Sequence, residues 1–300
     1  MSVPGPAACL FLCVAAAASA VPAAAGVEFV FDDAAAPALR ARPEAREVLE
    51  RAGRRVAGWL DAYDASIEVR VSDSSGSGFL ASASSLFLGD GEPGFQPRSP
   101  VMIEILTGRD LNGPEPDGVL EVDVSMPWGT GSVIRREEAD LEAVLVHELV
   151  HLLGFGATVG PGGADATGRP PGEPGSWGPF DRWLGDAEGP LIDLDTAVLD
   201  LGRYLAARVG GRGARGAGLY FWGPLAVEAN RGKPVPLYSP TEAQEGSTAS
   251  HLDDEAFTGV NLLMEAATAM GLSRRKLSPL EAAMLRDLGY ERLAIPGVER

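Results

Sequence analysis

"HELVHLLGF" (residues 147–155) holds two histidines four positions apart, with a glutamate directly after the first and a glycine three positions after the second. In a helix, positions i and i+4 lie on one face, so both imidazoles could reach the same ion. Zinc accepts imidazole nitrogen and lowers the pKa of bound water to about 7. The stretch therefore predicts His147 and His151 as metal ligands and Glu148 as the general base that acts on the water.

The alternative is an ordinary buried helix in which a glutamate stands between two histidines by chance, because short patterns with few fixed positions do recur. The chain has only three histidines in 300 residues, however, and two of them stand here in the required order. We therefore favour the metal site.

A catalytic zinc site needs a third protein ligand and an open coordination position. Position 157, where many enzymes with this motif carry a further ligand, is an alanine. The remaining histidine, His251, stands in "GSTASHLDDEAF" (246–257), 100 residues after His151. We expect His251 to be the third ligand, which requires the segment between them to loop out and return.

A downstream glutamate is the other way to complete such a site. Glu173 and Glu188 are available, but both stand in segments rich in glycine and proline, without a predicted helix to hold them. A zinc hydrolase with a glutamate as third ligand therefore stays open as an alternative. Asp253 and Asp254, next to His251, are either partners that orient the imidazole or solvated loop charges.

The rest of the chain predicts an α+β fold with a mixed sheet. Strands are expected at 27–31, 66–72, 85–89, 101–106 and 118–126, and an amphipathic helix at 43–63. The helix that carries the motif is expected to start near residue 136, with Glu137, Glu138 and Asp140 in its first turn, and to end at Gly154. The strand at 118–126 is either an ordinary sheet strand, which we favour, or the edge strand beside a peptide-binding cleft.

Further helices are expected around 199–209 and at 278–290. The second has clear end signals, with Ser278 as the cap, Pro279 at the first position, Glu281 completing a capping box and Gly289 as the stop. Residues 156–240 are rich in glycine and proline and predict a loop-rich insertion.

Together these features resemble leishmanolysin and its bacterial relatives, which are metzincin zinc endopeptidases. The resemblance rests on "HELVHLLGF", on the remote histidine in "GSTASH", on "NLLMEAA" (261–267) and on the ending "LRDLGY" of the last predicted helix. It implies a zincin fold with an active-site helix and a smaller C-terminal lobe. It also implies that His147, His151 and His251 bind one catalytic Zn²⁺, that Glu148 is the base and that Met264 forms the methionine turn beneath the metal.

Three departures from that family are visible. Leishmanolysin is rich in disulfides, whereas the only cysteines here, Cys9 and Cys13, lie in the N-terminal segment. No propeptide is evident before the first predicted strand. The position after Met264 is Glu265 rather than the tyrosine that some metzincins use to stabilise an oxyanion.

The N-terminal segment resembles a secretory signal peptide. Residues 7–25 carry no charge, have an apolar centre at "CLFLCVA" and contain small-residue cleavage sites at 18–20 and 23–25. No Lys or Arg precedes the apolar run, and an uncleaved membrane anchor is the alternative. We expect export to the periplasm or the medium, without stable insertion in a membrane.

The expected organisation is a signal peptide (1–25), an N-terminal zincin lobe with the active-site helix (26–155), the insertion (156–240) and a C-terminal lobe (241–300). The net charge of −17 is spread along the chain without a basic face, so nucleic acid is not an expected partner. A protein or peptide substrate is expected instead. The alternative outside enzymes is a secreted protein that binds zinc without turnover, although such a site would not need Glu148.

Overall fold

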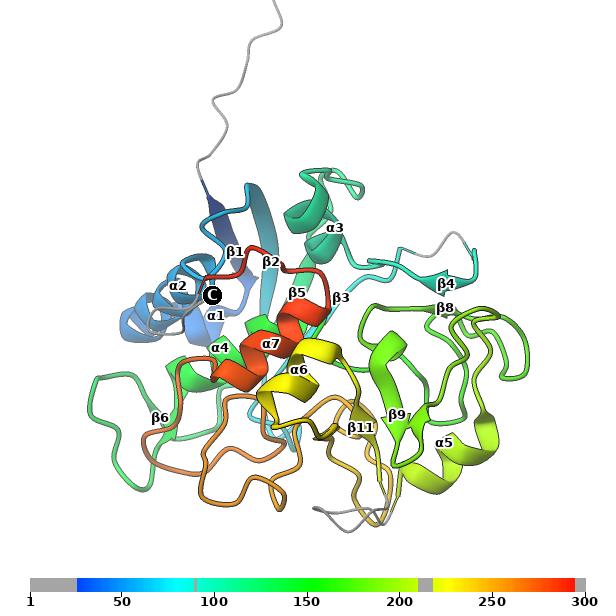
Figure 1. Cartoon of the computed structure of the whole chain (residues 1–300). Coiled ribbons are helices and arrows are strands. Elements are labelled where there is room, and N and C mark those ends of the chain that lie inside the picture. Colours follow the sequence, from blue (N-terminus) through cyan, green and yellow to red (C-terminus); the bar gives the residue numbers. More distant parts are fainter. Residues whose placement is uncertain (1–25, 89–90, 210–217, 295–300) are drawn as a thin grey trace, which may run out of the picture.

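The computed structural model describes residues 26–88, 91–209 and 218–294 (Figure 1). The predicted signal peptide lies outside the described residues. Within them the fold is mixed α+β, as predicted, with a mixed four-stranded sheet of order β1-β2-β5-β3. No helix in these ranges is long and apolar enough to cross a membrane.

The first sheet is parallel except at one edge. Strands β1 (Val27–Ala35), β2 (Ala65–Ser74) and β5 (Gly118–Asp123) run parallel, and β3 (Ala81–Ser85) pairs antiparallel with β5. In β1 and β2, buried apolar residues alternate with exposed ones, so one face of the sheet meets the core. Because β5 has strand neighbours on both sides, the ordinary sheet strand that we favoured is observed, and β3 forms the edge.

Two helices pack against this sheet and against each other. Helix α2 (Pro43–Ala57) contacts β1 and also α4 (Leu141–Leu152), which contains the motif and reaches β3. The predicted stripe of α2 is buried, with Val48, Leu49, Ala52 and Val56 each no more than 1% exposed. The motif helix α4 is therefore packed between α2 and the edge strand β3 of the sheet.

The expected strand at 101–106 is wrong, because this segment forms helix α3 (Pro100–Thr107). Its end signals were present in the sequence. The Ser99 side chain accepts a hydrogen bond from the Met102 backbone N–H, Pro100 takes the first position, and Gly108 adopts a left-handed conformation at the end with φ 70°. The apolar run alone did not distinguish a helix from a strand.

The expected strand at 85–89 is displaced towards the N-terminus. The ladder of β3 ends where Ser85 pairs with Gly118, the first residue of β5, so residues 86–88 have no strand to pair with. The Ser85 hydroxyl also donates to the Asp117 carbonyl at 2.6 Å and fixes this end.

The motif helix begins later than expected. Asp140 is its N-cap, and its carboxylate accepts a hydrogen bond from the Ala143 backbone N–H at 3.1 Å. Glu137 and Glu138 precede the helix. Glu138 instead binds Arg135, its neighbour in the preceding turn.

The segment expected to be a loop-rich insertion contains several short elements in its described part. They include a second four-stranded sheet of order β10-β9-β11-β12 and helices α5 (Leu201–Ala207) and α6 (Pro224–Ala229). Its strands are β9 (Leu184–Asp186), β10 (Gly189–Pro190), β11 (Tyr220–Phe221) and β12 (Val235–Pro236). The insertion also contains β8 (Ser176–Trp177) and the 3-10 turn η1 (Asp181–Trp183). The remaining short elements lie before it in the chain and are α1 (Pro37–Arg40), β4 (Gly94–Phe95), β6 (Trp128–Gly129) and β7 (Ala139–Asp140).

The C-terminal helix α7 (Pro279–Asp287) has the predicted capping box between Ser278 and Glu281. It packs on α6, and the chain then returns to the N-terminal half, where the Ala294 N–H donates to the Trp59 carbonyl at 2.9 Å. One connected hydrophobic cluster extends from Val27 to Leu293. The predicted N-terminal lobe, insertion and C-terminal lobe therefore all contribute residues to one core, which includes α4.

Candidate metal centre

Helix α4 carries the first two histidines and is buried on almost every side. Of its twelve residues only His151 is not fully buried. A helix that is apolar all round is typical of a protein interior, which explains why it has no solvated polar face. After the helix, Gly154 adopts φ 87°, a left-handed conformation that favours glycine, and the chain turns so that the Phe155 carbonyl reaches His151.

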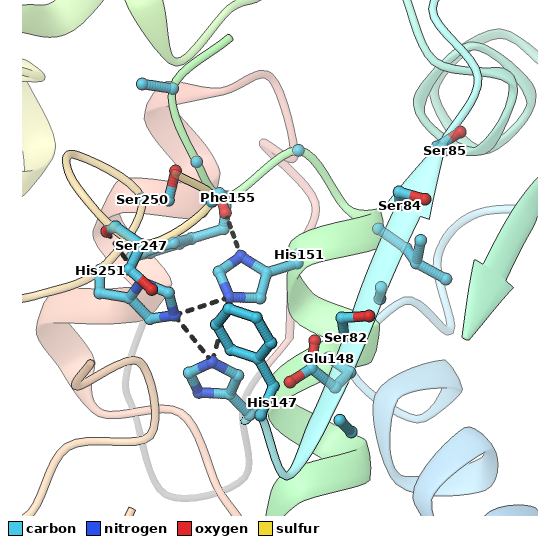
Figure 2. Close-up of a pocket in the computed structure, with 18 of the residues that line it drawn as sticks. Ser82, Ser84, Ser85, His147, Glu148, His151, Phe155, Ser247, Ser250 and His251 are labelled. Carbon is cyan, nitrogen blue, oxygen red and sulfur yellow. Dashed lines mark hydrogen bonds between the residues drawn. The ribbon is translucent and has the colours of Figure 1, made fainter. Parts of the chain in front are cut away.

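The structure brings all three histidines together (Figure 2). The Nε2 atoms of His147 and His151 are 3.0 Å apart, those of His151 and His251 3.1 Å, and those of His147 and His251 3.2 Å. His147 and His151 come from one helix face, as their spacing predicts. His251 arrives from a loop between β12 and α7.

Each imidazole is held through its other nitrogen by a backbone carbonyl. The Nδ1 atoms of His147, His151 and His251 lie 2.7, 2.6 and 3.0 Å from the carbonyl oxygens of Leu263, Phe155 and Ser247. A carbonyl oxygen only accepts, so each Nδ1 carries the proton and donates it. In a neutral imidazole the Nε2 atom then holds a lone pair and no hydrogen.

Three lone pairs therefore converge at about 3 Å with no hydrogen between them, and the three nitrogens cannot satisfy one another. A cation resolves this arrangement, and carbonyl partners on Nδ1 are the usual support of metal-binding histidines. The group of His147, His151 and His251 could thus hold a metal ion. The donor set of three imidazoles suits zinc and also copper, iron and nickel, so it does not identify the metal.

Burial keeps these imidazoles neutral. It lowers the pKa of His147 to about 3, an effect that the nearby His251 reinforces. Burial also lowers the pKa of His151 well below its usual value and lowers that of His251. Neutral imidazole is the form that binds metals.

Glu148 faces the cleft beside the histidines, on the side of β3 (Figure 2). It is 7% exposed, and burial raises the pKa of its carboxyl to about 8, while a hydrogen bond from the Ala83 backbone N–H on β3 opposes that shift. It does not belong to the group of His147, His151 and His251. Its carboxyl is thus a separate titratable group at the same site.

The site opens into a large cleft of about 940 Å³. One wall is the edge strand β3, whose Ser82, Ser84 and Ser85 appear in Figure 2, and the opposite wall includes Ser247 and Ser250 from the loop of His251. Because β3 is the last strand of its sheet, its outer edge has no strand partner among the described residues. Such an edge can pair with an extended peptide.

The loop that carries His251 is anchored to the Met264 segment. The Leu252 N–H donates to the Met264 carbonyl at 2.8 Å, and Met264 is fully buried. The resemblance implies that Met264 forms the methionine turn beneath the metal. The contacts that join it to the ligands are made by its backbone and by the carbonyl of Leu263.

The alternative third ligands do not reach the site. Glu173 and Glu188 are exposed in the insertion and are not part of the histidine group. Asp254 accepts a hydrogen bond from the Ala266 N–H at 2.9 Å, and Asp253 accepts from the backbone N–H groups of Glu255 and Ala256. These aspartates shape the loop, whereas the Ser247 carbonyl orients His251.

Several residues of the site were not predicted from the sequence. The strand β3, "ASASS" (81–85), lacks the apolar alternation of a strand and becomes recognisable only through its pairing with β5. The carbonyls of Leu263, Phe155 and Ser247 are backbone groups, so the residue types at these positions do not indicate their role.

Comparisons of the chain with protein-family models, with curated proteins and with solved structures found no significant match.

Proposed function

We propose that this protein is a secreted zinc-dependent endopeptidase of zincin fold. The observation that carries the proposal is the convergence of three Nε2 lone pairs beside a buried glutamate, at the floor of a cleft walled by an edge strand. Three protein ligands with a free coordination position are typical of catalytic rather than structural zinc.

In this proposal, His147, His151 and His251 hold the ion. Zinc bound there would polarise the scissile carbonyl and lower the pKa of water. Glu148 would take a proton from the attacking water and deliver it to the leaving amine. The outer edge of β3 would hold the substrate as an added strand through its backbone groups.

The resemblance to leishmanolysin supports the same assignment, because it uses all three histidines and Met264 in order along the chain. It extends over two windows, 147–155 and roughly 246–290, and gives no information on cleavage specificity. The proposal of membership in the metzincins rests on these residues together with the meeting of His251 and α4 in space.

The two rival functions have less support. A glutamate as third ligand would leave His251 without a role, although its Nε2 lies 3.1 Å from that of His151. A non-catalytic zinc protein would be expected to have a fourth side-chain ligand. Among the residues that the structure describes, no fourth His, Cys, Asp or Glu joins the group.

The test is hydrolysis of casein by the purified, zinc-loaded chain beside its Glu148→Gln variant, which has the same shape without a base. We expect the variant to retain one equivalent of zinc and to lose activity by at least about 10²–10⁴-fold, the usual contribution of a general base. Glu188→Gln serves as the matched control and should change neither property.

Equal activity in the wild type and the Glu148 variant would contradict the assigned role of Glu148. Zinc retained by His251→Ala but lost by Glu188→Gln or Glu173→Gln would favour the glutamate rival. If all variants hold zinc and the wild type cleaves none of a broad panel of proteins, the non-catalytic reading takes precedence.

Export is part of the proposal and rests on residues 1–25 alone. Mass spectrometry of the protein from the periplasm or medium of an expressing bacterium tests it. A mature N-terminus near residue 21 or 26 is expected, and an intact N-terminus in the membrane fraction would support the anchor instead.

A further inference from the structure

One peptide unit, the amide between Leu263 and Met264, connects the histidine group to the C-terminal helix. Its carbonyl oxygen accepts the hydrogen bond from His147 Nδ1 at 2.7 Å. Its N–H donates to the Glu281 carboxylate at 2.7 Å. Because both groups belong to the same amide, a continuous chain of hydrogen bonds runs from Glu281 through this peptide to His147.

Glu281 is unusual for the third residue of a helix, a position that is ordinarily solvated. It is 0% exposed, and its second oxygen accepts the Ser278 N–H at 2.6 Å in the capping box. Each carboxylate oxygen thus faces a backbone donor. Burial raises the pKa of the Glu281 carboxyl, and the two backbone donors oppose that rise because they stabilise its ionised form.

A buried negative charge at one end of this chain polarises the peptide between them. The Leu263 oxygen becomes a stronger acceptor, which fixes the His147 ring and increases the electron density at its Nε2. A carboxylate bonded directly to a metal-binding histidine acts in this way, and here a single amide is inserted between the two.

The same segment also reaches the second half of the site. The carbonyl of Met264 accepts a hydrogen bond at 2.8 Å from the N–H of Leu252, the residue that follows His251. The carboxylate that holds the Met264 N–H therefore restrains a segment in contact with both His147 and the loop of His251.

We propose that Glu281 is a positioning residue of the metal centre, which acts through the 263–264 peptide to orient His147 and to strengthen its Nε2 as a ligand. The proposal rests on the metal binding proposed above and extends it to the C-terminal helix. It also explains why a capping-box glutamate is fully buried against the segment of Met264.

Glu281→Gln tests the proposal, because glutamine keeps the size of the side chain but removes the charge and can accept from only one of the two N–H groups. Partners of metal-binding histidines usually contribute 10–100-fold to affinity, and with an amide between them we expect a loss of about 10-fold. The readouts are the zinc dissociation constant by chelator competition, the d–d absorption spectrum of the Co²⁺-substituted chain and the denaturant stability of the metal-free chain.

Two matched controls separate this role from helix stability. Ser278→Ala removes the hydroxyl that accepts the Glu281 N–H at 3.2 Å and leaves the contact with Met264 in place. Asp287→Asn changes another carboxylate of α7, which accepts two backbone N–H groups, from Leu225 and Ala226, at 3.1 and 2.8 Å but does not lead to a histidine. Both should lower the stability of the metal-free chain and leave the zinc affinity and the Co²⁺ spectrum unchanged.

Weaker zinc binding with a shifted Co²⁺ spectrum in Glu281→Gln alone is the expected result. An unchanged affinity and spectrum in that variant, or an equal loss of affinity in all three, would overturn the proposal. If Glu281→Gln does not fold, Glu281→Asp keeps the charge with a shorter reach, and wild-type affinity and spectrum in that variant overturn the proposal too. Failure of the wild type to bind zinc would instead refute the proposed function.

Discussion

The two halves of the candidate metal centre are built in different ways. His147 and His151 stand four residues apart on one buried helix, so their relative position follows from helical geometry. His251 stands on a loop, held by backbone hydrogen bonds such as that from the Tyr238 N–H to the His251 carbonyl at 2.9 Å. The first half is determined by neighbours in sequence, whereas the second exists only when distant segments have folded together.

This difference explains which half a sequence reveals. The helical half leaves a compact pattern that can be recognised by its spacing. The loop half leaves only a lone histidine, and its geometry depends on the segments around Tyr238 and Met264 and on the position of α7 behind them. Substitutions that remove a ligand from one half, that break the contacts between the two halves, or that change the packing of one half alone test this comparison.

The largest effect is expected from removing one ligand of each half. His151→Ala and His251→Ala should each weaken zinc binding by more than about 100-fold, because a lost ligand costs more than a lost partner of a ligand. Equilibrium competition with a chelator measures the affinity. If the loop half contributed only loosely, His251→Ala would retain affinity close to that of the wild type, and the comparison would fail.

The next effect concerns Arg275, which joins the segment after Met264 to the helical half. Its guanidinium contacts Asp140, the cap of α4, at 2.9 Å and Glu142 at 3.0 Å, and both carboxylates are almost fully buried. Arg275→Ala leaves Asp140 without its cation, so we expect a loss of about 3 kcal/mol in the free energy of unfolding. Urea denaturation of the metal-free chain measures it.

Arg274→Ala is the matched control for that experiment, because in the described structure its guanidinium donates to the backbone carbonyls of Lys276 and Asn261. Its charge also acts on Glu265 and Glu281, but it contacts neither Asp140 nor Glu142 in the described structure. It should cost less than about 1 kcal/mol. Equal losses in the two variants would show that the contact with Asp140 and Glu142 contributes nothing specific.

A pH effect of similar size on the free energy of unfolding is expected from Asp181, which binds Thr158 in the segment that follows α4. Asp181 is fully buried and accepts hydrogen bonds from the Thr158 backbone, from the Thr158 hydroxyl and from the Gly178 N–H. Burial raises the pKa of its carboxyl from 3.8 to about 6 in the folded protein. The folded state therefore binds the proton more tightly than the unfolded state, and the contribution of Asp181 to stability falls as pH rises from about 4 to about 6.

Two pKa units correspond to about 3 kcal/mol, so the stability advantage of the wild type over Asp181→Asn should shrink by up to about 3 kcal/mol between pH 4 and pH 7. Denaturant unfolding of both proteins across this range measures the difference. Thr158→Val, which keeps the carboxylate and removes one donor, should retain or increase the pH dependence. A constant difference between wild type and Asp181→Asn would contradict the inferred pKa.

The sequence was most informative where local rules determine the structure. The spacing of His147 and His151, the capping box of α7 and the buried stripe of α2 follow from helix geometry and end signals alone. The helix α3 was missed although Ser99, Pro100 and Gly108 marked its ends, because the apolar run between them also suits a strand.

Other features could not be predicted from local sequence. The strand β3 is made of alanine and serine, and it is an edge strand only because β5 pairs with it. The contact of Glu281 with the Met264 N–H joins two segments 17 residues apart through one peptide group. Backbone partners of this kind leave no pattern in the residue types, so the support of His251 and of His147 emerges only in three dimensions.

The smallest expected effect tests how rigidly the helical half ends. Gly154 has φ 87°, and a methyl group added there would overlap the Met102 sulfur. Gly154→Ala should therefore cost about 2 kcal/mol, of which roughly half comes from the left-handed backbone conformation and the rest from the overlap with a flexible side chain. Urea denaturation of the metal-free chain again measures it.

The same substitution in a Met102→Ala background separates the two causes. Without the sulfur the overlap disappears and only the backbone cost, about 1 kcal/mol, should remain. Zinc affinity should change little in either background if the position of His151 follows from the geometry of helix α4, which ends before Gly154. A large loss of zinc affinity in both backgrounds would mean that the turn at Gly154, rather than helix α4 alone, sets the position of His151. The contrast between a half determined by a helix and a half determined by a loop would then be wrong.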